Sequence, residues 1–361
     1  MNPPAAVLDA APDPVRAFRR DPTAEIVLVR RLTADLRTAS PRRFLVDIAG
    51  SALGGWGALA LAACPACPVA ARWSAGGVAA VLLYRALMFV HELFHQPGLR
   101  GVRHVWHLLV GIPTLVPLLL YQPIHQRHHS ADSYGTVADG EYEDLRGRCR
   151  RMAVRLLLSG CMMPVAVVLR FAVLAPLAWC VPVVRRRILP IFGHLTMRVP
   201  FRAPSLRGAA AAEAARIEVA CAIWAWLLIA ALLTGAASVV LIWAGVLAGV
   251  ALLNTLRALG ATHLYREEDA GRGALAQVAD SVNVECTGPL TRVICPIGLQ
   301  YHALHHAAPY LPYHAMRTAH RRLMAELPPG ALYRRAAVPS LWGGWLRLVR
   351  ATGPANRLDN P

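Results

Sequence analysis

His125-Gln126-Arg127-His128-His129 places three imidazoles within five residues, directly after the apolar stretch Val105 to Tyr121. If this segment is helical, positions i, i+3 and i+4 share one face, so the three rings converge on one point. The same spacing returns in His302-Ala303-Leu304-His305-His306, and His91 and His95 form a related i, i+4 pair. With 14 histidines in 361 residues, chance predicts roughly 0.02 copies of His-x-x-His-His. The three groups therefore predict a histidine-based metal site rather than separate sets of core histidines.

The composition predicts a membrane protein that crosses the bilayer several times. Hydrophobic residues make up 56% of the chain, charged residues 16%, and the mean hydropathy is +0.40, which is more apolar than a soluble globular chain. The first residues lack a basic start followed by an apolar run, so we expect no secretory signal. Of the eight cysteines, Cys64 and Cys67 form the one close pair, in a short turn between two apolar stretches, where a small apolar turn is expected rather than a bridge. The other six show no metal-ligand spacing, so the metal site should use nitrogen ligands without thiolate.

The net charge of +17 raises the question of a nucleic-acid partner. Every basic residue is Arg, however, and Arg concentrates in the segments that flank the apolar stretches. There it contacts lipid headgroups and sets the orientation of the chain in the membrane. We therefore expect the positive charge to contact a membrane and not a nucleic acid.

Four apolar stretches are each near the length that a helix needs to cross a bilayer: Phe44 to Ala63, about Trp73 to Val90, Ile217 to Leu233, and Ala237 to Leu256. The Arg-rich residues 1–43 predict that the chain begins in the cytoplasm, with both short hairpin turns outside. All three histidine groups, together with His263 just beyond the fourth stretch, then fall on the cytoplasmic face. We expect an integral, multi-pass membrane protein with its histidine site on that face.

Two further apolar stretches are expected not to cross. Val105 to Tyr121 is short and broken by one Gly and two Pro, which predicts an interfacial or re-entrant element. Met152 to Val184 contains three Pro and Arg170. An Arg at the centre of a lipid-exposed span costs about 2.5–3.5 kcal/mol, so membrane-surface helices are expected there. The expected fold is thus all-α, a polytopic bundle of about four transmembrane helices with a cytoplasmic helical cap carrying a di-metal histidine site.

The histidines are too many for one ion. The candidate ligands are His91, His95, His125, His128, His129, His263, His302, His305 and His306. A zinc site takes four ligands, so two ions that share these nitrogens, with room for water or oxygen, fit better. Neutral imidazole suits Fe, Zn, Cu and Ni alike, so spacing alone does not select the metal. Carboxylates that could orient imidazole N–H groups are Asp132, Asp139, Glu141 and Asp280.

The order of the three groups among four spans resembles the three histidine boxes of the membrane fatty acid desaturases. Thr136, Asp139, Glu141 and Tyr142 resemble that family's acidic continuation after the second box. Pro309-Tyr310-Leu311-Pro312-Tyr313 resembles the aromatic and proline continuation after the third. The resemblance covers roughly residues 44–327.

The resemblance implies a non-haem di-iron centre that uses O₂ and two external electrons to remove two hydrogens from adjacent carbons of an acyl lipid. It identifies His263 as similar to the extra histidine after the fourth span, and it implies no catalytic residues beyond the metal ligands. The chain would divide into a cytoplasmic tail (1–43), the desaturase domain (44–330) and a C-terminal tail (331–361). In that last tail an apolar stripe predicts an interface-lying helix, although a packed core helix fits nearly as well; the stripe consists of Leu341, Trp342, Trp345, Leu346 and Val349.

The sequence has no His-Pro-Gly-Gly haem motif, so electrons should come from a separate donor of ferredoxin or cytochrome type. The excess of Arg offers a docking surface if that donor is acidic. Two alternatives remain. A lipid hydroxylase or ketolase of the same superfamily would insert oxygen at the same centre. A His-lined metal transporter would place polar groups at mid-membrane, whereas these histidines lie at the ends of spans.

Overall fold

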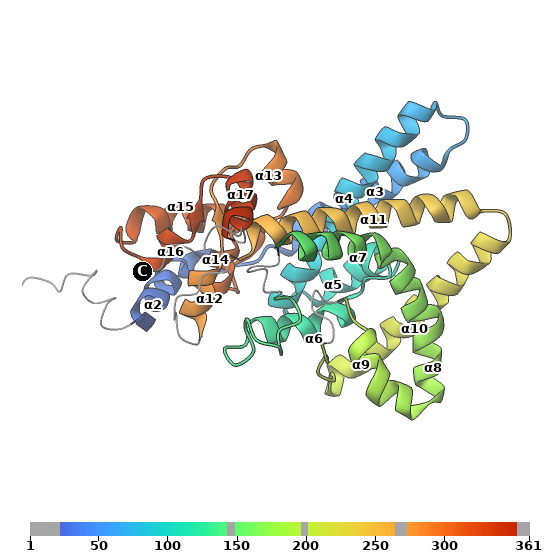
Figure 1. Ribbon diagram of the computed structural model, residues 1–361, viewed down its shortest axis with the longest axis horizontal. Coiled ribbons are helices and arrows are strands. Elements are labelled where there is room, and N and C mark those ends of the chain that lie inside the picture. Colours follow the sequence, from blue (N-terminus) through green and yellow to red (C-terminus); the bar gives the residue numbers. More distant parts are fainter. Residues whose placement is uncertain (1–21, 143–148, 196–200, 264–272, 352–361) are drawn as a thin grey trace, which may run out of the picture.

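Long apolar helices form the body of the molecule. The computed structural model describes residues 22–142, 149–195, 201–263 and 273–351, and within these ranges five helices are long and apolar enough to cross a membrane. They are α3 (Pro41–Ala63), α4 (Val69–His95), the stretch Ala153–Cys180, α10 (Gly208–Leu233) and α11 (Ala237–Ala261). In Figure 1 their far ends point to the right, and shorter helices gather at the left. The mostly helical fold with long apolar helices confirms the predicted membrane bundle.

The stretch Ala153–Cys180 differs from the expected surface helices. It is one continuous helix, built from α7 (Cys149–Leu169), the π-helical turn η3 (Arg170–Leu174) and α8 (Ala175–Cys180). Arg170 does not face lipid as expected: its side chain is only 5% exposed and lies 3.0 Å from Glu218 of α10. Because the charge is buried against an opposite charge, the insertion cost of a lipid-exposed Arg does not apply.

After α8 the chain turns back toward the end of the bundle at which α7 begins. The helices η4 (Val184–Ile188) and α9 (Leu189–Phe192) lead to Phe201, which packs on Ile124 near the histidines. The beginning of α7 is at the same end, where Leu156 packs with Leu259 of α11. The fifth long helix therefore does not separate the histidine groups onto two sides of the bundle.

The segment between the first two histidine groups folds back on itself. Here α5 (Arg100–Trp106) and η2 (His107–Gly111) run inward, and α6 (Leu118–His128) runs back to the histidines. At the tip, the indole N–H groups of Trp224 and Trp243 each donate to the carbonyl of Pro113 at 3.0 Å. The segment thus starts and ends at the same side of the bundle, as a re-entrant element does.

The remaining short elements form a cap around the third histidine group. They are α2 (Pro22–Leu32), η1 (Ala34–Leu36), α12 (Ala274–Asp280), α13 (Pro289–Ile294), α14 (His302–Ala307), α15 (Tyr313–Glu326), α16 (Leu332–Arg335) and α17 (Leu341–Ala351). A two-stranded parallel sheet joins β1 (Asn283–Val284) to β2 (Ala337–Val338) and is the departure from an all-α fold in the described ranges. The first of these helices, α2, packs on the cap through Ile26 and Val29.

The C-terminal helix α17 has one packed and one exposed face. The indole N–H of Trp345 donates to the carbonyl of Leu256 at 3.0 Å, and the Trp345 ring lies against Gly260 at the end of α11. On the other face Trp342 and Val349 are exposed. Features of both sequence-based alternatives, packed and exposed, are therefore present in one helix.

Candidate metal centre

The three histidine groups come from the ends of three helices. The last turn of α4 carries His91 and His95, the last turns of α6 carry the second group, and the short helix α14 carries the third. The i, i+4 pair of α4 and the i, i+3, i+4 spacing of the other two groups put the imidazoles of each helix on one face. His263 follows the last residues of α11, where it pairs with Ser281 in an isolated β-bridge. We call this end of the molecule the histidine end.

Five histidines form the larger group. Ligand nitrogens of His91, His95, His125, His129 and His305 all lie within 4.8 Å of one another. The Nε2 atom of His125 lies 2.8 Å from Nε2 of His95 and 3.0 Å from Nε2 of His129. Nε2 of His305 lies 3.0 Å from that of His129. All three sequence groups therefore contribute to one cluster.

Three histidines form the smaller group. They are His128, His302 and His306, and Nε2 of His306 lies 3.1 Å from Nε2 of His302. The ring of His263 lies beside this group, with its centroid 5.5 Å from the centroids of His128 and of His302. The structure therefore brings the nine predicted histidines together, eight in the two clusters and His263 next to the smaller one.

The donor set fits two metal ions. Burial lowers the pKa of His125, His305 and His306 well below the usual range, so these rings are neutral, the form that binds metal. Neutral imidazoles whose Nε2 atoms converge leave lone pairs facing one another. Both ring nitrogens of His91 and Nδ1 of His305 are buried and have no hydrogen-bond partner among the described residues. A cation within each cluster would satisfy lone pairs that otherwise carry an unpaired desolvation cost, so the clusters are consistent with a di-metal site.

Two of the predicted carboxylates accept hydrogen bonds from Nδ1 atoms of the second histidine group. Nδ1 of His128 donates to Oδ2 of Asp139 at 3.0 Å, and Nδ1 of His125 donates to Oε1 of Glu141 at 3.0 Å. A proton fixed on Nδ1 leaves the Nε2 lone pair directed into the cluster. Burial disfavours the charged His128 ring, but the Asp139 carboxylate outweighs burial and raises the pKa of His128.

The other two carboxylates differ. Asp280 accepts from the hydroxyls of Tyr142 at 2.7 Å and Tyr134 at 3.3 Å. The Tyr134 hydroxyl in turn lies 3.2 Å from Nδ1 of His263, so Asp280 reaches that histidine through a tyrosine. Asp132 is exposed, and no contact with the histidines is recorded for it in the described part of the chain.

Two positioning residues were missed by the sequence analysis. Gln277 of α12 accepts from Nδ1 of His306 through Oε1 at 3.0 Å and donates from Nε2 to the carbonyl of His129 at 3.3 Å. Its distance along the chain from both histidines left no local signal. The Tyr121 hydroxyl lies 2.8 Å from Nδ1 of His125, and here the i, i+4 spacing on α6 was a usable signal.

A family model described as fatty acid desaturase matches residues 68–337. Over 338 residues the chain is 35% identical to a protein described as ceramide hydroxylase from Caulobacter vibrioides (strain NA1000 / CB15N), an alignment that covers 91% of this chain and 95% of the relative. No solved structure gives a significant match.

Proposed function

The chain belongs to the fatty acid desaturase family, and from that premise we propose that it is a membrane di-iron hydroxylase acting on ceramide or a closely related lipid. The single observation that supports oxygen insertion is the relative described as a ceramide hydroxylase, which aligns over nearly the whole of both chains. The resemblance in the histidine boxes alone favours desaturation. Box spacing does not separate the two outcomes, because both begin by removing a hydrogen from an unactivated carbon.

The two reactions have different products. Hydroxylation converts R–H, O₂, two electrons and two protons into R–OH and one water. Desaturation uses the same O₂, electrons and protons but removes two hydrogens from the lipid and releases two waters. An alkyl C–H bond offers no acid or leaving group to side chains, so the bound metals supply the oxidising chemistry.

We assign one iron to each histidine cluster. The larger cluster would supply five imidazoles. The smaller cluster would supply three, and His263, held by Tyr134 and Asp280, would complete it. The role of the surrounding residues is to hold protons on Nδ1 atoms: Asp139 for His128, and Gln277 for His306. Iron rather than another metal is taken from the family, since imidazole nitrogen suits several metals.

The surroundings of the site suit a lipid with a polar head and an apolar tail. The histidine end lies where the long apolar helices meet the polar cap, so a lipid could keep its chain along the helices while its reacting carbon reaches the metals. The Arg-rich N-terminal segment supports a cytoplasmic position for this end. Arg-rich surfaces there would also suit a separate acidic electron donor of ferredoxin or cytochrome type.

Product analysis in a ceramide-containing host tests the proposal. The host should express the chain together with a ferredoxin and its reductase, under ¹⁸O₂, beside the variants His128→Ala and His104→Ala. His104 is exposed and lies outside both clusters, so it is the matched control. We expect a ceramide that gains one ¹⁸O atom with the wild type and with His104→Ala, but not with His128→Ala. A new double bond without label would make the chain a desaturase, and unchanged lipids in all strains would contradict both assignments.

A further inference from the structure

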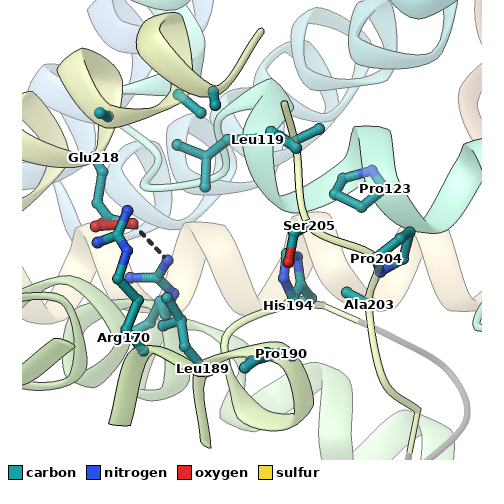
Figure 2. Close-up of a pocket in the computed structure, with 15 residues that line it drawn as sticks. Leu119, Pro123, Arg170, Leu189, Pro190, His194, Ala203, Pro204, Ser205 and Glu218 are labelled. Carbon is teal, nitrogen blue, oxygen red and sulfur yellow. Dashed lines mark hydrogen bonds and ion pairs between the residues drawn. The ribbon is translucent and has the colours of Figure 1, made fainter. Parts of the chain in front are cut away.

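A pocket of about 200 Å³ lies behind the metal-binding helix α6. Its lining comes from α6, η3, η4, α9, α10, His194 and residues 203–206 (Figure 2). Leu119 and Pro123 are its contacts with α6. Pro123 is two residues before His125, which on a helix turns its side chain about 160° away from that histidine. The pocket therefore contacts the helix of the second histidine group but lies on the opposite face from the metal centre.

A buried ion pair closes one end of this pocket. Nη2 of Arg170 donates to Oε2 of Glu218 at 3.0 Å, and Nε of Arg170 donates to the carbonyl of Gly193 at 2.9 Å. The other carboxylate oxygen of Glu218 accepts from the indole of Trp179 at 2.8 Å. Nη1 of Arg170 is buried and has no partner among the described residues. A buried charged donor without an acceptor is unfavourable, so the positive charge of Arg170 is only partly compensated by its neighbours.

The charges around the pocket favour an anion. Arg170 and Arg185 line it with two positive charges, against the one negative charge of Glu218. His194 also lines it, and burial lowers the pKa of this histidine to about 4, so it is neutral. The described lining residues therefore carry one positive charge in excess, next to a free guanidinium donor. Phosphate and carboxylate oxygens are the groups that guanidinium binds best.

A second basic hollow adjoins the pocket. That hollow, about 420 Å³, shares Pro204 and Ser205 with the pocket and is lined by Arg127 and Arg207. Both of these arginines are exposed. The remaining wall of the first pocket is apolar, with Leu119 and Leu189 among its residues. The combination of a cationic end, a basic opening and an apolar wall matches a lipid headgroup whose chains leave along the helices.

We infer that this pocket binds the phosphate of an anionic membrane lipid, held by the positive charges of Arg170 and Arg185, which both line it. This lipid occupies a site separate from the metal centre and is not the substrate. Free inorganic phosphate offers the same chemistry from solution, and the experiment distinguishes the two sources.

The test uses the full-length purified protein and counts bound lipids by native mass spectrometry, with thermal unfolding as a second readout. Phosphatidylglycerol is titrated against phosphatidylcholine with the same acyl chains. Arg170 is left intact, because its removal would leave Glu218 buried without a partner. Arg185→Gln removes a pocket charge, and Arg187→Gln is its control, an exposed Arg of the same η4 helix outside the lining. Ala214→Leu fills the pocket from α10, and Ala212→Leu, exposed and outside the lining, controls for it.

We expect one phosphatidylglycerol to bind roughly tenfold or more tightly than phosphatidylcholine. Both lipids carry the phosphate, but the choline group of phosphatidylcholine adds a positive charge beside Arg170 and Arg185, which repel it. Arg185→Gln and Ala214→Leu should each weaken that binding about tenfold, and their controls should not change it. If millimolar phosphate raises the unfolding temperature of the wild type but not of Arg185→Gln, and phosphatidylglycerol has no effect, the anion site stands and its ligand is soluble phosphate. Equal binding of the two lipids without a phosphate effect, or equal losses in variants and controls, overturns the inference. No turnover is measured, so this outcome is independent of the proposed hydroxylase activity.

Discussion

Replacing Asp139 by Asn should weaken metal binding far more than the loss of one charge at a surface site would. Asp139 is fully buried and accepts four hydrogen bonds. Its Oδ2 accepts from Nδ1 of His128 and the backbone N–H of Gly135, and its Oδ1 accepts from the backbone N–H groups of Glu141 and Tyr142. An Asn side chain has one oxygen, so in either orientation its NH₂ group faces two of these four donors.

The magnitude follows from that count. Each buried donor left without an acceptor costs about 1–3 kcal/mol, so two such donors cost about 2–6 kcal/mol, with relaxation of the loop favouring the lower end. Because the same carboxylate orients His128, we expect metal affinity to fall about 10–100-fold, the usual effect of losing a group that orients a ligand. Glu141→Gln is the matched control. Glu141 accepts from His125 through Oε1, and a Gln oxygen can keep that bond, so its affinity should fall less than tenfold.

The assay is competition for iron between the purified protein and a chelator of known affinity, with membrane insertion and helix content checked for both variants. Thermal unfolding with and without metal separates the two effects of the substitution, because a binding loss appears as a smaller metal-induced shift. Wild-type affinity in Asp139→Asn would refute the reasoning. Equal losses in Asp139→Asn and Glu141→Gln would show that charge alone, and not the four accepted bonds, sets the effect.

Three further predictions concern other contacts. Because His305 joins the larger cluster at 3.0 Å from His129, His305→Ala should reduce product below detection while membrane fractionation shows normal insertion; wild-type turnover would exclude His305 as a ligand. Gln277→Leu removes the acceptor for Nδ1 of His306 and should lower metal affinity about 10–100-fold, whereas Gln277→Glu keeps an acceptor and should lose less in the same chelator competition. Arg170→Met leaves the Glu218 carboxylate buried without its cation and should lower the free energy of unfolding by about 3–5 kcal/mol, measured by denaturant unfolding in detergent. The double variant Arg170→Met, Glu218→Met should lose less stability than the single variant, and an equal or larger loss would contradict the pairing.

The local features of the site were predictable from sequence because they depend on helical spacing. The i, i+3, i+4 pattern of His125, His128 and His129 placed these rings on one face before any tertiary contact was known, and Asp139 and Glu141 lie close enough along the chain to reach them. Gln277 was not predictable in this way, since its contact with His306 depends on how α12 packs against α14. The division of the histidines into a group of five and a group of three is equally a property of packing, because each group mixes residues from separate helices.

Arg170 shows why the expected exposure of its charge to lipid was wrong. The cost of an Arg within an apolar stretch is a property of its surroundings, and a single sequence reveals only the neighbours along the chain. The neutralising partner, Glu218, is 48 residues away and comes from another long helix. The pair therefore removes the objection to a span and at the same time leaves a buried, partly unsatisfied guanidinium on a residue that lines the pocket behind α6. A buried charge in a membrane helix that keeps a free donor after pairing is better explained by a ligand than by stability, since two apolar residues of similar volume would fill the same space without the desolvation cost.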